Sequence, residues 1–203
     1  MPPADDVVPA KAALRARLLA ARRARPAAER ERAATAVAAA LRTGLATART
    51  VAAHVPEAVE PGHGRLPGEL AGAGTRVLLP VVRGRELAWA EHDGRLAPGR
   101  FGLLEPVGPR LGPEAIGSAD AVVVPALAVS RSGVRLGRGG GYYDRALAHA
   151  RPDAVLVAVV FDGELLDDLP AEPHDRRVTA VVTPTGGWEI ISRPHLPRRT
   201  EPT

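Results

Sequence analysis

The chain has 203 residues, of which 45% are hydrophobic and 25% are charged. A chain of this size buries one sizeable core, and its length favours one domain. It contains no cysteine, which excludes a disulfide framework, a thiolate zinc site and a cysteine nucleophile. The net charge of +4 is unevenly placed, because residues 1–49 hold ten Lys and Arg against four Asp and Glu.

This basic N-terminal excess indicates an anionic partner. Nucleic acid is the weaker explanation, because aromatic residues make up only 3% of the chain and no zinc-finger or RNA-recognition motif is present. A small polyanion such as ATP is the simpler partner. The first residues, MPPADDVVPA, are acidic where a secretion signal is basic, and no apolar run reaches membrane-spanning length. We therefore expect a soluble, cytoplasmic protein with no membrane or nucleic-acid partner.

Two helices are predicted at the start of the chain. In residues 10–25, Leu14, Leu18 and Leu19 recur at helical spacing with arginines on the other face. Pro26 ends this helix, and an alanine-rich helix follows at about 27–43.

The rest of the chain alternates short apolar runs with helical stretches. Several runs are continuous, which is typical of strands in a sheet covered on both faces. The strand candidates are 50–55, 76–82, 86–92, 121–129, 154–160 and 178–183, and the helix candidates are 65–72, 113–119 and 142–150. This order predicts an α/β layered fold with a mainly parallel central sheet. Periodicity is lost near Gly186, so we expect one domain over 1–185 and a loosely held tail over 186–203.

The stretch 121–147, AVVVPALAVSRSGVRLGRGGGYYDRAL, runs from an apolar strand through a glycine-rich loop into a helix. Glycines let the main chain approach a phosphate, and the amides at a helix start point toward an anion. Arg135 and Arg138 add cations for phosphate oxygens, and Asp144 lies in the first helical turn, where a carboxylate can hold magnesium. The loop is neither a dinucleotide-binding loop nor a Walker loop, because it lacks the third glycine and the Lys-Ser/Thr pair.

Lys11 is the only lysine among 27 basic residues. A planar guanidinium does not imitate a compact ammonium, so this lysine is a candidate for a specific contact. The alternative is chance retention on a solvated helix. In either case we expect an exposed residue in the first helical turn.

The segment RLGRGGGYYDRAL, with VPALAV upstream, resembles the signature of the 5-formyltetrahydrofolate cyclo-ligase family. The resemblance extends to the K-x-x-x-R formed by Lys11 and Arg15, to LLPVV, to FGLLEP at 101–106 and to LPAEPHDRRVTAVVTP near the end. It implies a three-layer α/β/α fold, ATP and Mg²⁺ as cofactors, and 5-formyltetrahydrofolate as substrate.

The resemblance also implies roles for individual residues. Lys11 and Arg15 match ATP contacts, Glu60 matches a glutamate that contacts the folate, and Asp144 and Asp175 match magnesium positions. The ATP loop comprises Arg135, Leu136, Gly137, Arg138, Gly139, Gly140, Gly141, Tyr142 and Tyr143. Ser130 stands where many members have Asp, and His54 where many have an aromatic residue.

The implied reaction phosphorylates the formyl oxygen, which then leaves as phosphate when N10 closes the ring. Such a transfer needs positioning and charge neutralisation rather than a covalent nucleophile. Arg138 lies between glycines with nothing apolar to pack against, so we expect it nearest the transferring phosphoryl, with Lys11 as the second catalytic cation.

Two other classes of function stay open on residues alone. One is a nucleic-acid-binding protein that uses the basic helices, and the other is a sugar-phosphate isomerase or coenzyme A transferase that holds phosphate without hydrolysing ATP. The joint presence of Lys11, Glu60, Asp144 and Asp175 favours the cyclo-ligase. We expect it to act as a monomer. His63 and His174 are interpreted as ordinary loop histidines, and Glu105 as either a folate contact or a turn residue.

Overall fold

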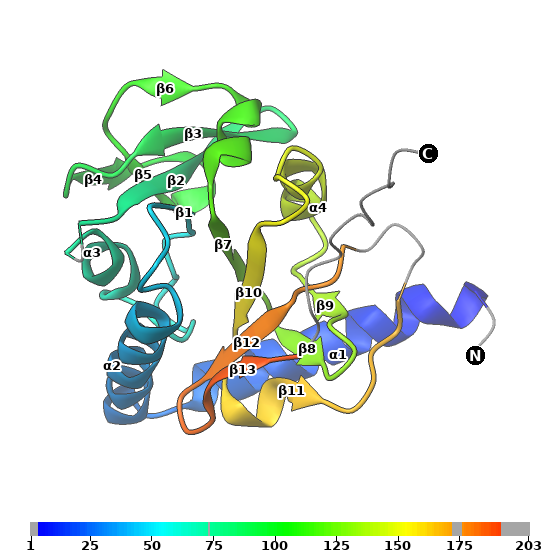
Figure 1. Cartoon of the computed structure of the whole chain (residues 1–203). Coiled ribbons are helices and arrows are strands. Elements are labelled where there is room, and N and C mark those ends of the chain that lie inside the picture. The colour runs from blue at the N-terminus through cyan, green and yellow to red at the C-terminus, as the bar shows by residue number, and fades with distance from the viewer. Residues whose placement is uncertain (1–3, 73, 172–175, 192–203) are drawn as a thin grey trace, which may run out of the picture.

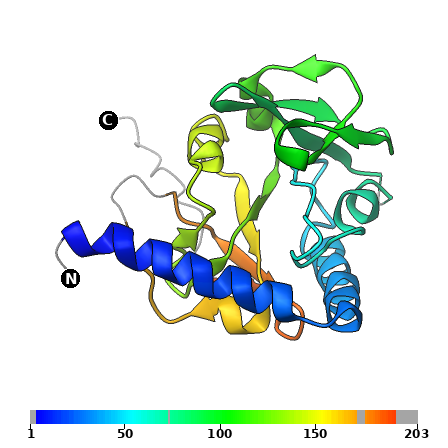
Figure 2. The ribbon, with the colours of Figure 1, turned by 180° about the vertical axis from the view of Figure 1, so that it is seen from behind.

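The computed structural model describes residues 4–72, 74–171 and 176–191 (Figures 1 and 2). Two helices come first, α1 (Ala4–Ala24) and α2 (Ala27–Gly44). Between them Pro26 has a φ of −57°, as its ring imposes, and an extended ψ of 145°. The helix α1 starts earlier than predicted and contains Pro9. In the described part of the chain, no helix is both long enough and apolar enough to cross a membrane.

The centre of the fold is a sheet that has eight strands in the described residues. In spatial order they are β13 (Gly187–Ile190), β12 (Ala180–Thr183), β10 (Val155–Val159), β7 (Ala121–Pro125), β1 (Thr50–Ala52), β2 (Arg76–Arg83), β3 (Glu86–Glu91) and β6 (Arg110–Leu111). The strands from β12 to β2 run parallel, and β13, β3 and β6 are antiparallel at the two edges. The predicted mainly parallel sheet is confirmed.

Helices cover both faces of this sheet, as continuous apolar strands require. On one face α2 and α3 (Leu66–Ala71) pack on it, with Val37 and Leu41 against Val51 and Val123. On the other face lie α4 (Tyr142–Leu147) and the 3₁₀ helix η2 (Pro113–Ser118), with Leu147 packed in the same cluster as Trp89. The three-layer prediction is therefore confirmed, and Trp89 belongs to the core.

A small second sheet supports α1. It consists of β11 (Leu165–Leu166), β8 (Ala128–Ser130) and β9 (Arg135–Leu136), and α1 lies along it (Figures 1 and 2). Leu18 of α1 packs with Leu127 and Leu136. The predicted single strand 121–129 is therefore wrong, because its two halves lie in different sheets. Pro125 has no N–H to continue a ladder, and the chain leaves the central sheet there.

Short elements complete the carboxyl edge of the sheet. They are the hairpin of β4 (Leu96–Pro98) and β5 (Leu104–Pro106), with η1 (Arg100–Gly102) between its strands, and η3 (Asp162–Glu164) after β10.

The C-terminal prediction needs correction over residues 187–190, because β13 pairs with β12 in the main sheet. A tight turn makes this pairing possible. Gly187 adopts a positive φ of 65°, and the Gly186 amide donates to Thr183 Oγ1 at 3.0 Å. Residues 192–203 of the predicted tail lie outside the described residues.

Candidate active site

A cavity of about 530 Å³ opens at the carboxyl ends of β1 and β7. The strand order reverses here, because β1 has β2 on one side and β7 on the other. In open α/β sheets, ligands bind at such a reversal. The loop after β1, the β5 region and the glycine loop all contribute to its wall.

The glycine loop enters the cavity from β9 and not from a central strand. Gly139 and Gly141 have φ values of +95° and +67°, a region that side chains rarely adopt. The helix that follows, α4, has six residues and ends at Leu147, before the predicted end at residue 150. So short a helix has little macrodipole, and the positive charge at the loop comes from arginines.

The helix α1 contacts this loop directly. Arg15 Nε donates to the carbonyl oxygen of Gly137 at 2.9 Å, and a Cβ on Gly139 would lie 3.6 Å from Arg15 Cζ. Lys11 is one turn earlier on the same face of α1. Its expected exposure is wrong, because it is 7% exposed and lies beyond the first turn of the longer helix. The structure thus brings the N-terminal K-x-x-x-R helix onto the predicted ATP loop.

The two loop arginines pair with carboxylates. Arg135 forms an ion pair with Asp144. Arg138 reaches Glu57 Oε1 at 2.8 Å and Glu60 Oε1 at 3.1 Å. Glu57 was not predicted, although a carboxylate three residues before Glu60 in a tight loop was a usable signal. Arg138 therefore links the glycine loop to the loop after β1.

Glu60 sits at the inner end of this link and is 7% exposed. Its Oε2 accepts the Glu57 backbone N–H at 2.9 Å and lies 3.9 Å from His54 Nε2. Burial lowers the pKa of His54, more than the neighbouring Glu60 carboxylate raises it. Burial, with Glu60, also raises the pKa of Tyr143, whose buried hydroxyl has no hydrogen-bond partner among the described residues.

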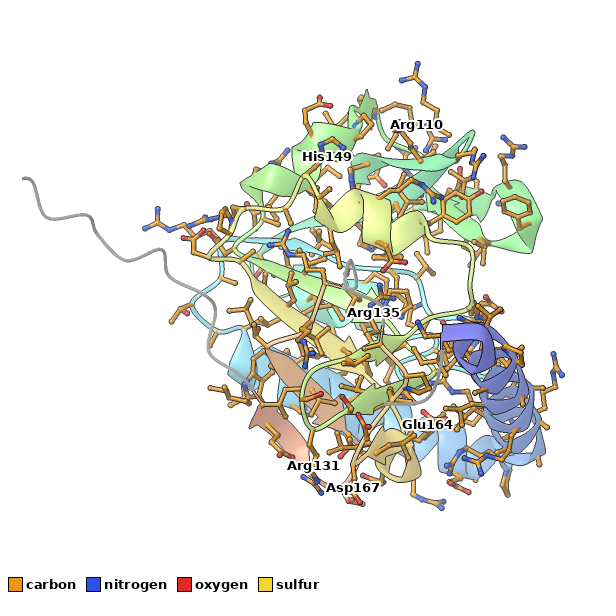
Figure 3. The ribbon with its side chains drawn as sticks, turned by 90° about the vertical axis from the view of Figure 1, so that its right-hand side faces the viewer. Arg110, Arg131, Arg135, His149, Glu164 and Asp167 are labelled. Carbon is orange, nitrogen blue, oxygen red and sulfur yellow. The ribbon has the colours of Figure 1, made fainter. Side chains whose placement is uncertain are left out.

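A buried ion pair fastens α1 beside the site. Arg22 is fully buried, and its Nε and one terminal nitrogen reach the two oxygens of Glu164 at 2.8 and 2.7 Å. The same nitrogen donates to the carbonyl oxygen of Ala126 at 2.6 Å. Figure 3 shows Glu164 close to α1. The prediction that the arginines of this helix occupy its outer face is wrong for Arg22. Helical periodicity contains no information about a buried carboxylate that is distant in the sequence.

The donor set for magnesium is sparse in the described residues. Asp144 is half exposed at the mouth of the cavity, and no cluster of three or more acidic or histidine side chains forms a metal site in residues 4–72, 74–171 and 176–191. Asp175, the other predicted ligand, and His174 lie outside the described residues. One carboxylate fits Mg²⁺ that arrives coordinated by phosphates, since this ion commonly keeps several water ligands and only one or two carboxylates.

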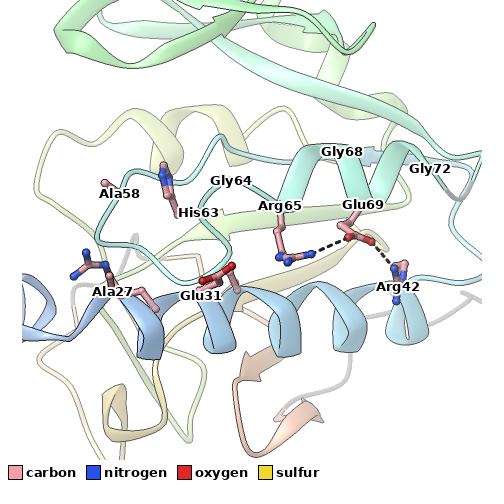
Figure 4. A pocket seen from close by; sticks show the side chains of 12 residues that line it. Ala27, Glu31, Arg42, Ala58, His63, Gly64, Arg65, Gly68, Glu69 and Gly72 are labelled. Atoms are coloured by element: carbon pink, nitrogen blue, oxygen red, sulfur yellow. Dashed lines mark hydrogen bonds and ion pairs between the residues drawn. The ribbon is translucent and has the colours of Figure 1, made fainter.

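The remaining candidates have structural partners. Glu105 lines the cavity and accepts the Val82 N–H at 3.0 Å. His63 faces a second hollow of about 840 Å³ between α2 and α3, where Arg42 and Arg65 both pair with Glu69 (Figure 4). None of the predicted site residues that the structure describes lines this second hollow.

The fold and the first cavity define an α/β enzyme in which a cation-bearing glycine loop meets a carboxylate-bearing pocket. The model of the 5-formyltetrahydrofolate cyclo-ligase family matches residues 7–184. A 5-formyltetrahydrofolate cyclo-ligase from Mycolicibacterium smegmatis is 49% identical over 184 residues, which cover 87% of this chain and 95% of that protein. One from Escherichia coli is 35% identical, with 58% of this chain and 68% of that protein covered.

Solved structures agree. The 5,10-methenyltetrahydrofolate synthetase of Aquifex aeolicus has a TM-score of 0.76 and 30% identity, and 94% of this chain and 96% of that one are covered. The Mycoplasma pneumoniae synthetase, with a TM-score of 0.68 and 21% identity, matches in fold over 84% of this chain and 96% of that one. The chain therefore belongs to the 5-formyltetrahydrofolate cyclo-ligase family. It is a ligase of folate metabolism, and its family implies that it uses ATP.

Proposed function

We propose that this chain converts 5-formyltetrahydrofolate and ATP to 5,10-methenyltetrahydrofolate, ADP and phosphate. One observation carries the proposal beyond family membership. Arg15, from the N-terminal helix, bonds to the glycine loop at Gly137, and the same loop reaches Glu60 through Arg138. A phosphate-binding half and a carboxylate-bearing half thus share one cavity.

The chemistry assigns these groups to two substrates. Lys11, Arg15, Arg135 and the glycine loop bind the triphosphate of ATP, and Glu60 binds the folate. The formyl oxygen attacks the γ-phosphorus, and ADP leaves. N10 then attacks the formyl carbon, loses its proton, and the C–O bond breaks to release phosphate. Arg138 stabilises the charge on the transferring group, because its guanidinium lies between the loop and Glu60.

Magnesium belongs to this proposal as the ion carried by ATP. Asp144, together with Asp175, would hold it, and its charge would offset that of the phosphate oxygens. Asp144 already pairs with Arg135, so the carboxylate is held at the mouth of the cavity. The single domain, which includes β13, would act as a monomeric, cytoplasmic enzyme. A chain without cysteine is compatible with a reducing compartment.

The deciding experiment mixes protein, MgATP and 5-formyltetrahydrofolate and follows the rise in near-ultraviolet absorbance of the methenyl product. ATP consumption is measured in parallel. We expect ATP to be consumed only when the folate is present, because the phosphoryl acceptor is an atom of the substrate. Equal ATP turnover without folate, or no absorbance rise with all components, would contradict the proposal.

A further inference from the structure

His54 lies just after β1, in the wall of the same cavity, and is 6% exposed. Its Nδ1 lies 3.3 Å from the carbonyl oxygen of Val123. A carbonyl oxygen only accepts hydrogen bonds, so the proton of a neutral His54 is on Nδ1. Nε2 then carries a lone pair, and its direction is fixed by the bond that Nδ1 makes.

The neutral form of this imidazole is favoured at physiological pH, because the pKa of His54 lies below its ordinary value. Burial lowers its pKa most strongly, Glu60 raises it, and the guanidinium groups of Arg22 and Arg138 lower it further. The distance of 3.9 Å from Nε2 to Glu60 Oε2 is too long for a hydrogen bond between the two side chains. Two acceptors therefore face each other. Within the described residues, no hydrogen bond reaches His54 Nε2.

The Glu60 carboxylate is held in place but keeps accepting capacity. Oε1 accepts from Arg138 at 3.1 Å and Oε2 from the Glu57 N–H at 2.9 Å. A carboxylate oxygen has two accepting directions, so Oε2 can accept one more donor. His54 and Glu60 both line the cavity. A ligand NH2 group in the cavity would donate one N–H to each of these two acceptors.

One amino group fits between them. At the usual N–H hydrogen-bond length of about 2.9 Å from each atom, two acceptors 3.9 Å apart subtend an angle of about 84° at the donor nitrogen. The two N–H bonds of a planar amino group diverge by about 120°, so each acceptor lies about 18° from an N–H direction. That deviation is within the range of a good hydrogen bond.

We propose that His54 Nε2 and Glu60 Oε2 together bind the 2-amino group of the pterin ring of the substrate. This inference rests on the proposed function, which supplies the pterin. It adds a specificity-determining residue to the folate end of the cavity.

The test changes His54 in the protein and the 2-amino group in the substrate, separately and together. Wild type, His54→Phe and His54→Gln are compared with 5-formyltetrahydrofolate and with its 2-oxo counterpart, in which oxygen replaces the amino group. Phe fills the space of the imidazole without an acceptor, whereas the Gln side-chain oxygen reaches a similar point. The preference for the amino compound, measured as the ratio of the two kcat/KM values, is independent of how much protein is folded.

Wild type should prefer the amino compound. We expect His54→Phe to narrow this preference by roughly tenfold, as loss of one hydrogen bond implies, with the KM for ATP unchanged. His54→Gln should recover most of it. A preference that is equal in wild type and His54→Phe overturns the assignment, and so does a Gln variant no better than Phe. If wild type fails to turn over 5-formyltetrahydrofolate, the proposed function itself fails, which separates the two outcomes.

Discussion

The buried pair of Arg22 and Glu164 offers a prediction whose size follows from the structure. The Arg22 side chain is 0% exposed and that of Glu164 is 4% exposed, and two charge-assisted hydrogen bonds join them. Glu164 also accepts the Phe161 N–H at 2.8 Å. In Glu164→Leu the guanidinium stays buried without its anion, which typically costs about 3–5 kcal/mol.

The expected change is large for a chain of this length. At about 2–4 °C per kcal/mol, Glu164→Leu should lower the melting temperature by about 6–20 °C. Adding Arg22→Met removes the unpaired cation, and the double variant should recover most of the loss because an apolar pair of similar volume often replaces a buried ion pair at little cost. Asp167→Asn is the control: Asp167 is 3.5 Å from Arg131 on the surface, and its loss should cost less than about 1 kcal/mol.

Thermal melting and urea unfolding at pH 7 compare these three variants with the wild type, and steady-state kinetics are measured on the same four proteins. The helix α1 also carries Arg15 to the glycine loop, so loosening the pair should raise the KM for ATP more than that for the folate. If Glu164→Leu unfolds at the wild-type urea concentration, or if the double variant is no more stable than the single one, the reasoning about the buried charge is refuted.

Three further predictions concern single side chains. Lys11→Arg should lower turnover, and Lys11→Ala should lower it further, by roughly ten- to a hundredfold in kcat/KM for ATP. Because Lys11 is buried, the Ala variant should also have a lower melting temperature. Unchanged kinetics in Lys11→Arg would contradict a role of Lys11 in nucleotide binding. Asp144→Asn should raise the Mg²⁺ concentration needed for half-maximal turnover, and a chelator should abolish turnover. Asp120 accepts the N–H groups of Thr50 and Arg49, which lower its pKa most, and Arg151 lowers it further. The Asp120 carboxylate therefore stabilises the folded protein fully above its ordinary pKa, and this contribution is lost as the pH falls through the lowered pKa of the folded state. Urea unfolding measured between pH 5 and pH 2 should show this loss of stability in wild type and a smaller loss in Asp120→Asn.

Local pattern was enough for most of the scaffold. The leucines of α1, the alanine-rich α2 and the apolar runs of β1, β2, β7, β10 and β12 each match elements of the structure. These elements are set by burial, and burial has a period in sequence. The glycine loop was recognisable for a related reason, because positive φ values at Gly139 and Gly141 restrict residue choice.

Long-range electrostatic pairs had no such local signal. Arg22 and Glu164 are 142 positions apart, and Arg138 and Glu60 are 78 apart. A helical pattern does not distinguish an arginine that forms a buried ion pair from one that faces water. For this reason the pattern places Arg22 on the outer face of the helix, which is wrong. The division of 121–129 between two sheets was missed because an apolar run shows that a segment is buried and does not show which sheet buries it.

The difference between apolar burial and long-range ion pairs also explains where the site lies. The five parallel strands from β12 to β2 bury aliphatic side chains on both faces, so charged groups are accommodated where the strands end. There each loop supplies one member of a pair: Glu60 follows β1, Glu164 follows β10, and the partners Arg138 and Arg22 come from the glycine loop and α1. Ion pairs at this edge hold the loops around a polar cavity, while the stability of the sheet depends on apolar burial behind it.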